Sequence, residues 1–455
     1  MSDHKVAVLN LEWASYPCRD RIMATLVCNY LRYQGYSVNE ESIFNGYYWI
    51  NRLRPRVFFI TNTIGAKENF EIVKYANGKG LKVISLISEG NFKETKDFVE
   101  EFVWGWNKEK IMYEDIHLQW SERTRNLTLK YYPELNSKVR VSGGVGFDIY
   151  KILPLPERES FLKKYGKEKY QKIVGIGCYD FSSYYPHDHR FNIVKKVYSS
   201  EAEIIRFRRD RDSFREILSR IIPANPDILF LLKKHPGAPA DNFAAGIEGL
   251  ESLDNVLIIQ SQEVIFDCLA VSDFWLVYDS TTALEAWLMD KPTGLINPSG
   301  TDFLRDNLYL GSPNYSTVEE LQKAIDEYYR SGNLVGFAEK EPERRKLIKD
   351  IVQWDDGLNH VRAGNEIISL LENNLTGEYK PEPPDYLVKR LRNRLLWIFS
   401  PALKFLPKFR FYAERKKNFN RKQLRDFQEK LLKAQIQFYR SRNLSSDKLK
   451  KIKCL

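Results

Sequence analysis

Continuous apolar runs alternate with amphipathic segments over roughly the first 370 residues of the chain. The runs VAVLNL, RVFFITN, KVISLIS, DIHLQWS and KVRVSGG resemble strands of a parallel sheet that are buried on both faces. Between them, KENFEIVKYANGKG spaces its apolar residues three and four positions apart and ends on glycine, as an amphipathic helix does. This alternation predicts a doubly wound α/β domain.

The pattern breaks at KILPLPERES, which carries two prolines, and then starts again. Strand-like runs follow at KIVGIGCYD, DILFLLKKHPG, NVLIIQ, DFWLVYDS and TGLINP, with helix-like segments between them. Two similar halves predict two Rossmann-like domains facing a cleft, at residues 1–152 and 153–372. Ligands of open α/β sheets bind beyond the carboxyl ends of the strands, so the residues that follow the strands are the candidates for chemistry.

The last part of the chain has a different composition. A Pro-rich, acidic linker is expected at residues 373–385. Residues 386–455 contain 21 Lys and Arg against 4 Asp and Glu, a balance of +17. The whole chain carries +10, so the body carries −7. This balance argues against a nucleic-acid-binding body and for a tail that touches something anionic.

Two helices are expected in this tail. Leu387, Leu391 and Leu395 share one helix face among several Lys and Arg residues, followed by Trp397 and Phe399. Such a composition predicts an interfacial helix on anionic lipid, with a helix packed on the body as the alternative. The segment RKQLRDFQEKLLKAQIQFY carries a second apolar stripe, which indicates a packing surface.

Composition limits the class of protein further. A length of 455 residues exceeds what one hydrophobic core usually serves. No apolar stretch is long enough to span a bilayer, and the N-terminus lacks the features of a signal peptide. Five scattered cysteines without a CxxC pair indicate neither a zinc site nor a disulfide framework. We expect a cytoplasmic protein that binds the inner face of the membrane through residues 386–455.

The run LFLLKKHPG ends a buried strand on cationic and titratable side chains. Pro236 keeps His235 out of helical geometry, so the chain turns here and the imidazole is free to point toward a ligand. A histidine beside a phosphate donates a hydrogen bond and, when protonated, offsets its charge. Lys234 is a further candidate for a phosphate or carboxylate, although lysines at strand ends are usually just solvated.

The stretch YDSTTALEA opens a helix after another strand. Ser280, Thr281 and Thr282 are three hydroxyl residues in a row, more than one helix cap needs. A helix start with extra hydroxyls is typical of a phosphate site. Glu285 lies one turn further on, where its carboxylate would accept both ribose hydroxyls of a nucleotide or simply favour the helix start.

Other motifs carry weaker signals. Gly175 and Gly177 in VGIGCYD would let a nucleotide approach the backbone, but without the third glycine of GxGxxG a simple tight turn is the favoured explanation. The sequence PHDHR is interpreted as a polar loop, because three adjacent residues seldom bind one ion. The DRD of RRDRD lies before a helix among arginines, so it is discounted as a metal motif.

A His-Pro pair after a strand, followed by a Ser/Thr-rich helix start, resembles the GT-B glycosyltransferases that use CMP-activated sugars, chiefly bacterial sialyltransferases and Kdo transferases. Those sialyltransferases also carry an acid-glycine motif in the first domain. Here SEGNF matches it in part, because Ser88 replaces the first of its two acidic positions. CDP-glycerol transferases have similar His-Pro and Ser-Ser elements. The resemblance covers residues 1 to about 370.

The resemblance implies an inverting transfer with an acceptor site in the first domain and a donor site in the second. Glu89 would be the general base, with Glu12 and Asp20 in reserve. The donor would be held by Lys234, His235, Pro236, Ser280, Thr281, Thr282, Glu285 and Gly177. The expected reaction moves a nonulosonic acid or Kdo from a CMP-sugar to a lipid-linked or surface glycan, without a metal or other cofactor.

Three alternatives remain open. The first is polyol-phosphate transfer from a CDP donor. The second is a sugar-nucleotide epimerase, ranked lower because STTALEA lacks the paired glycines and extra acid associated with that family. The third is a non-catalytic, membrane-bound scaffold with a vestigial nucleotide site.

Overall fold

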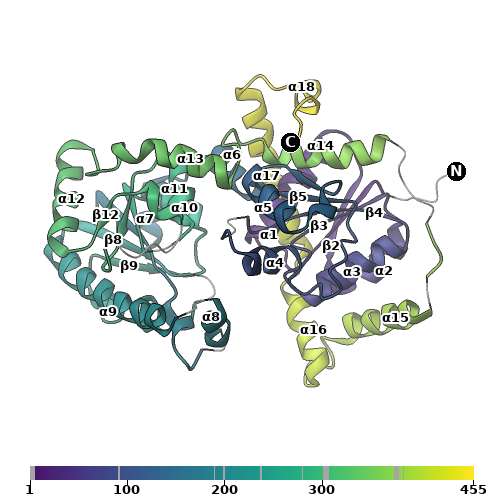
Figure 1. The fold of residues 1–455 in the computed structure, drawn as a ribbon, viewed down its shortest axis with the longest axis horizontal. Coiled ribbons are helices and arrows are strands. Elements are labelled where there is room, and N and C mark those ends of the chain that lie inside the picture. The colour runs from purple at the N-terminus through teal and green to yellow at the C-terminus, as the bar shows by residue number, and fades with distance from the viewer. Residues whose placement is uncertain are drawn as a thin grey trace. The chain divides into compact units, whose positions relative to one another are not determined.

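The computed structural model describes residues 6–90, 93–188, 190–197, 200–235, 238–278, 280–300, 307–373, 379–382 and 384–455. Pro236, one of the predicted donor residues, lies outside these ranges. The chain divides into two compact units. Unit 1 comprises Met1–Leu153 and Lys349–Leu455, and unit 2 comprises Pro154–Ile348. Each unit is built around its own six-stranded parallel sheet (Figure 1).

Unit 1 has the strand order β2-β1-β3-β4-β5-β6. Its strands are β1 (Val8–Glu12), β2 (Val38–Ser42), β3 (Val57–Thr61), β4 (Lys82–Leu86), β5 (Ile116–Gln119) and β6 (Val139–Val141). The helices in its N-terminal part are α1 (Arg19–Tyr33), α2 (Gly46–Leu53), α3 (Lys67–Gly78), α4 (Lys96–Val103), α5 (Glu122–Tyr131) and α6 (Ile149–Ile152). The order reverses between β1 and β3, so this sheet has its topological switch point there.

Unit 2 has the strand order β12-β11-β10-β7-β8-β9. The strands are β7 (Lys172–Gly177), β8 (Ile228–Lys233), β9 (Val256–Ile259), β10 (Phe274–Val277), β11 (Thr293–Ile296) and β12 (Asn314–Tyr315). Its helices are α7 (Arg158–Lys164), α8 (Phe191–Val197), α9 (Glu201–Ala224), α10 (Ile265–Val271), α11 (Thr282–Leu288) and α12 (Val318–Ser331). Helix α13 (Glu341–Ile351) leads out of the unit. This is the Rossmann order, with its switch point between β7 and β10.

The central strands of both sheets are buried on both faces. All six residues of β8 and all five of β1 and of β3 are buried. Burial on both faces requires apolar residues at successive positions, which is why these strands have continuous apolar runs. The predicted α/β class with two Rossmann-like halves is therefore confirmed.

The second half of the body ends earlier than residue 372. The chain rejoins unit 1 at Lys349, and α14 (Asn359–Glu372) packs on α1. Gly364 permits this close packing, since a Cβ there would lie 2.3 Å from the Tyr30 ring. The hydroxyl of Tyr30 also donates a hydrogen bond to Asn365 Oδ1 at 2.6 Å. The expected boundary at 372 was wrong because α14 covers the first sheet rather than the second.

The basic C-terminal region is helical, as predicted, but it is not a separate tail. It forms α15 (Pro384–Phe399), α16 (Pro407–Lys417), α17 (Arg421–Ser441) and α18 (Ser446–Lys450). Leu431 of α17 and Leu449 of α18 are buried in unit 1. The backbone of Leu455 exchanges two hydrogen bonds with Val141 of β6, at 2.9 and 3.1 Å. The stripe predicted in α17 is thus a packing face of unit 1, so α17 and α18 belong to its core.

A buried polar chain joins three distant segments of unit 1. His360 Nδ1 lies 2.7 Å from Asp148 Oδ2, and His360 Nε2 lies 2.5 Å from the Tyr439 hydroxyl. All three side chains are buried.

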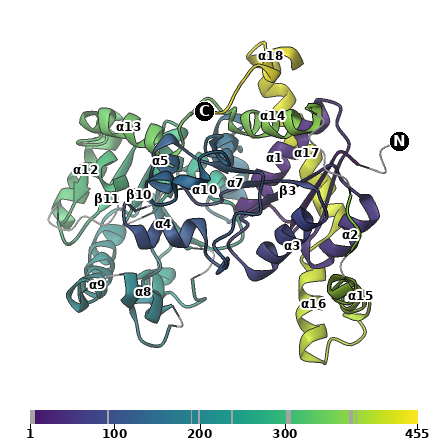
Figure 2. The same ribbon diagram turned by 45° about the vertical axis from the view of Figure 1, so that its right-hand side comes forward.

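Figure 2 shows α14 and α18 on one side of unit 1, and α15 and α16 together on the opposite side. Among the described residues, no helix combines the length and the apolar character that crossing a membrane requires.

Candidate functional site

The switch point of unit 2 gathers the predicted phosphate-binding residues. Strand β7 lies between β8 and β10, so the residues that follow β8 and β10 lie on either side of its carboxyl end. Strands are about 4.8 Å apart, which places these two strand ends roughly 10 Å from each other. His235 comes after β8, and Ser280, Thr281 and Thr282 come after β10. The topology thus brings together residues separated by 45 positions in the sequence.

The three hydroxyl residues have different surroundings. Ser280 Oγ accepts hydrogen bonds from the Thr282 N–H at 3.2 Å and from the Thr282 hydroxyl at 3.1 Å. Thr282 Oγ1 in turn accepts a hydrogen bond from Trp275 Nε1 at 3.0 Å, so it faces the sheet. Thr281 is exposed at the start of α11. Of the three residues, Thr281 is therefore the most exposed.

Gly177 is required where β7 ends. A Cβ at this position would lie 2.7 Å from Thr282 Oγ1 and 3.1 Å from Trp275 Nε1. Any larger residue would displace the hydrogen bond between these two side chains. Gly177 therefore keeps the beginning of α11 close to the sheet.

His235 is exposed at the end of β8. Its backbone carbonyl accepts hydrogen bonds from the Ala238 N–H at 3.0 Å and from the Gln260 side-chain amide at 3.4 Å. These contacts hold the turn that follows the strand. His235 is therefore an exposed residue at the carboxyl edge of the sheet.

The two lysines before His235 are buried rather than solvated. The ammonium group of Lys234 donates to the carbonyls of Ala240 and Asp241 at 2.8 and 2.7 Å. It thereby anchors the loop after β8, a structural task that the sequence did not indicate. Lys233 donates to the carbonyl of Gln260. Burial lowers the pKa of Lys233, an effect that Glu285 on α11 opposes.

Asp210, which belongs to the DRD sequence discounted as a metal motif, has a structural role. It lies on α9 and is buried. Its carboxylate accepts a hydrogen bond from the Tyr278 hydroxyl at 2.5 Å and another from the hydroxyl of Ser299. Tyr278 follows β10 and Ser299 follows β11, so one carboxylate ties two strand ends together. No local pattern signals this role, because it depends on α9 packing beneath both loops.

Another ionic cluster lies after β7. Arg190 donates to Asp180 Oδ2 at 2.8 Å and to Asp188 Oδ2 at 2.7 Å. The hydrogen bonds from Arg190 hold the pKa of Asp188 well below its usual range. The PHDHR sequence therefore contributes an ion pair, while His189 lies outside the described residues. Across the described part of the chain, no three His, Cys, Asp or Glu side chains form a group suited to a metal ion.

The switch point of unit 1 holds a buried carboxyl group. Glu12 ends β1, and its Oε1 accepts hydrogen bonds from the Thr61 hydroxyl at 2.8 Å and from Asn10 Nδ2 at 3.1 Å. Burial raises the pKa of Glu12 to about 8, and this outweighs the opposing charge of Arg21. Asp20 raises it further. Glu12 is thus largely protonated at neutral pH.

Glu89 lies at the same edge of this sheet, after β4, and is exposed. Its carboxylate pairs with Arg19 Nη1 at 2.5 Å, and Arg19 also contacts Asp20 at 3.3 Å. Gly90 packs flat against Trp120, since a Cβ would lie 2.4 Å from that ring. The glycine therefore serves close packing, and it sets the position of Glu89.

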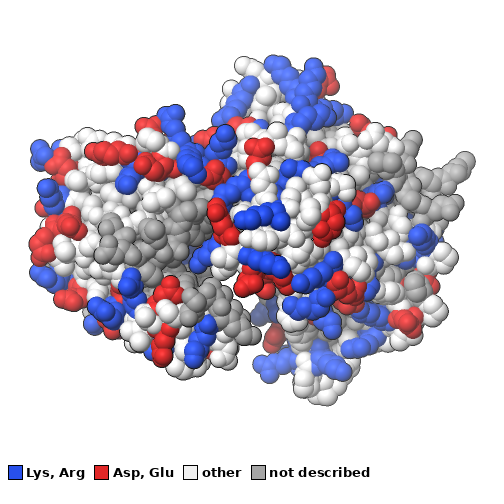
Figure 3. Space-filling view, in the orientation of Figure 1, with Lys and Arg blue, Asp and Glu red and all other residues white. Residues whose placement is uncertain are grey.

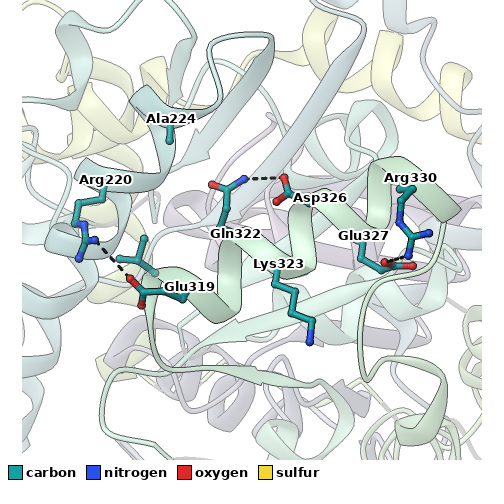
Figure 4. Close-up of a pocket in the computed structure, with 9 residues that line it drawn as sticks. Arg220, Ala224, Glu319, Gln322, Lys323, Asp326, Glu327 and Arg330 are labelled. Carbon is teal, nitrogen blue, oxygen red and sulfur yellow. Dashed lines mark hydrogen bonds and ion pairs between the residues drawn. The ribbon is translucent and has the colours of Figure 1, made fainter.

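A groove of about 560 Å³ lies elsewhere in unit 2, between α9 and α12 (Figure 4). Its charged residues pair with each other, as in Arg220–Glu319 at 3.5 Å and the Arg330–Glu327 pair. Gln322 donates to Asp326 at 2.8 Å. None of the predicted site residues lines this groove, and its walls are helical surfaces rather than strand ends. It is not the candidate site.

No protein-family model and no curated protein matches the sequence. Solved structures do share its fold. A Staphylococcus aureus MnaA–UDP complex is 14% identical over 81% of this chain and 97% of its own, with a TM-score of 0.52. A putative UDP-N-acetylglucosamine 2-epimerase from Listeria monocytogenes is 12% identical over 81% of this chain and 98% of its own, with a TM-score of 0.53. At such identities the likeness shows the fold, which is the GT-B type with two Rossmann-like units.

Proposed function

We propose that the protein is an enzyme that uses a nucleotide-activated sugar and that unit 2 binds the nucleotide. The observation that carries this proposal is the position of His235 after β8 and of Ser280–Thr282 after β10, the two strands that flank β7 in a Rossmann-type sheet. A helix start, exposed hydroxyl and imidazole are suited to phosphate oxygens. Two of the solved structures that share the fold are named for UDP or a UDP-sugar.

We further propose that the reaction is an inverting glycosyl transfer, with the acceptor bound by unit 1. Glu89 is accessible and would remove the proton from the acceptor hydroxyl. The resulting oxygen nucleophile attacks the anomeric carbon as its bond to the phosphate breaks. His235 would hydrogen-bond the departing phosphate and offset its charge. Arg19 and Asp20 would keep the carboxylate of Glu89 oriented.

The donor proposed is a CMP-activated nonulosonic acid or Kdo, because the His-Pro and Ser/Thr elements resemble those of CMP-dependent transferases. The acceptor proposed is a lipid-linked or surface glycan, reached from the cytoplasmic face of the membrane. Polyol-phosphate transfer from a CDP donor needs the same phosphate contacts and stays as an alternative. A non-catalytic scaffold would bind the nucleotide without turning it over.

A sugar-nucleotide epimerase is the second candidate, favoured by the names of the structures that share the fold. An epimerase needs no acceptor. Incubating the protein with UDP-N-acetylglucosamine alone and separating the products would reveal inversion at C2. Such turnover would replace the transferase proposal, whereas an unchanged substrate would count against the epimerase.

Nucleotide binding is the direct test. We expect CMP or CDP to raise the melting temperature of the protein and UMP or UDP to do so much less. A ligand at 100 times its Kd stabilises by about 2.7 kcal/mol. Thr281→Val should reduce this stabilisation, because it replaces an exposed hydroxyl with a methyl group. Ser219→Ala, an exposed hydroxyl on α9, is the matched control. Equal or tighter UDP binding would refute the CMP assignment, and the lack of any nucleotide effect would refute the nucleotide site.

A further inference from the structure

Helix α15 has an apolar face turned toward solvent. Val388, Leu391, Leu395 and Ile398 are 68%, 51%, 53% and 44% exposed. Their spacing of three, four and three residues places them along one face of the helix, and we call this row the outward stripe. A soluble helix normally turns such a row toward the protein core.

The opposite face of α15 is the one that packs against the protein core. Tyr386 and Trp397 pack against the hydrophobic core of unit 1, together with Tyr412 of α16. Leu396 is buried. The outward stripe is therefore not a core face that has been misplaced. The helix is apolar on two sides, one of which unit 1 covers.

The turn between α15 and α16 continues the apolar surface. Phe405 is 74% exposed, and Phe399 and Leu406 are exposed as well. Figures 1 and 2 show α15 and α16 side by side at the edge of unit 1, with this turn at their ends. The outward stripe and the turn thus form one contiguous hairpin surface, consisting of exposed residues within 387–406.

The charge around this surface is strongly positive. Residues 384–417 contain ten Lys and Arg against two Asp and Glu. Some of these cations serve unit 1: Lys389 pairs with Glu71 at 2.6 Å, and Arg390 pairs with Glu382 at 3.0 Å. Others are solvent-exposed, namely Arg392, Lys404, Lys408, Arg410 and Lys417. Figure 3 shows blue side chains gathered at the lower edge of unit 1, where α16 lies.

The charge of the surrounding residues distinguishes two partners for the outward stripe, a second copy of the chain and a lipid surface. A second copy of the chain would meet the same stripe related by a twofold axis, which would bring two sets of cations together. Like charges across an interface oppose association. A lipid surface with anionic headgroups is complementary to both features, because apolar side chains enter the acyl boundary and Lys and Arg meet phosphates.

We propose that the α15–α16 hairpin docks on anionic lipid, with α15 lying in the plane of the interface and the outward stripe entering it. This inference does not depend on the proposed enzymatic function. It also differs from the expectation drawn from the sequence, because α17 and α18 support unit 1 and only residues 384–417 face the lipid.

Sedimentation of the full chain with vesicles tests the proposal. The wild type should sediment with vesicles of phosphatidylcholine and phosphatidylglycerol, but weakly with phosphatidylcholine alone, and added salt should release it. Replacing Arg392, Lys404 and Lys408 with Gln should weaken binding about fivefold per residue, or roughly 100-fold together. Replacing Val388, Leu391 and Leu395 with Ser should weaken it by about tenfold per side chain.

Ile205→Ser is the matched control, because Ile205 is an exposed apolar residue on α9 in unit 2. Its vesicle binding should equal that of the wild type. All substituted side chains are exposed, so circular dichroism and melting temperature should confirm that the variants fold. Wild-type-like binding by the two triple variants would overturn the proposal, as would a wild type that ignores anionic vesicles. A dimer that dissociates in the Ser variant would instead assign the stripe to self-association.

Discussion

Replacing Glu12 with Gln should remove a large part of the pH dependence of the stability of unit 1. Glu12 is buried, and its pKa is raised to about 8 from an ordinary value of 4.5. Its Oε1 accepts hydrogen bonds from Asn10 and from the Thr61 backbone and hydroxyl. A Gln side chain can accept the same hydrogen bonds, but it cannot ionise. The substitution therefore isolates the free-energy cost of burying the ionised carboxylate of Glu12.

The direction of this pH dependence follows from the number of protons that the folded and unfolded states bind. Between about pH 4.5 and pH 8 the folded protein holds a proton on Glu12 that the unfolded chain has lost. The free energy of unfolding of the wild type therefore falls as the pH rises through this window, with a limiting slope of about 1.4 kcal/mol per pH unit from this group. The accumulated loss near pH 8 is about 4–5 kcal/mol. Glu12→Gln should lack this loss and should be more stable than the wild type at high pH.

The assay is urea unfolding from about pH 5.5 to about pH 8.5, followed through the protection of unit 1 peptides against proteolysis, since the two units need not unfold together. Glu134→Gln is the control, because this exposed side chain of unit 1 meets water in both states. Its profile should follow that of the wild type. Parallel profiles for the wild type and Glu12→Gln would refute the account of a buried, protonated carboxyl group.

Three further predictions concern the sites and the C-terminal region. Glu89→Gln should lower turnover by about 10²–10⁴ with little change in donor Kd, because the proposed base faces the acceptor; if turnover is normal, Asp20 is the next candidate, since Glu12 is buried and its pKa is raised to about 8. His235→Ala should weaken donor binding by about 10- to 150-fold and also slow turnover, as isothermal titration and rate assays would measure; an unchanged donor Kd would remove His235 from the site. Tyr439→Phe should destabilise unit 1 by about 1–3 kcal/mol in urea unfolding, since it leaves the buried Nε2 of His360 without its hydrogen-bond partner, and no effect would show that this hydrogen bond contributes little to stability.

The sequence alone was sufficient to predict the α/β class and the two Rossmann-like halves. Strands such as β1 and β8 are buried on both faces, so their apolar runs are a local signal that needs no knowledge of neighbours. The candidate residues beyond β8 and β10 were also found locally, because they follow recognisable strands. Their placement on either side of β7 was not local information, since it depends on the order of the strands in the sheet.

Only the tertiary structure decided the surroundings of each side chain. Lys234 was expected near a ligand or in solvent, yet it binds loop carbonyls, and Glu12 became a buried acid with a raised pKa. The basic C-terminal helices also differ in their surroundings. Helix α17 packs into unit 1, whereas α15 keeps an apolar face in solvent. Burial and charge environment arise from segments far apart in the sequence, such as Val141 with Leu455, and these contacts leave no pattern in the residues on either side.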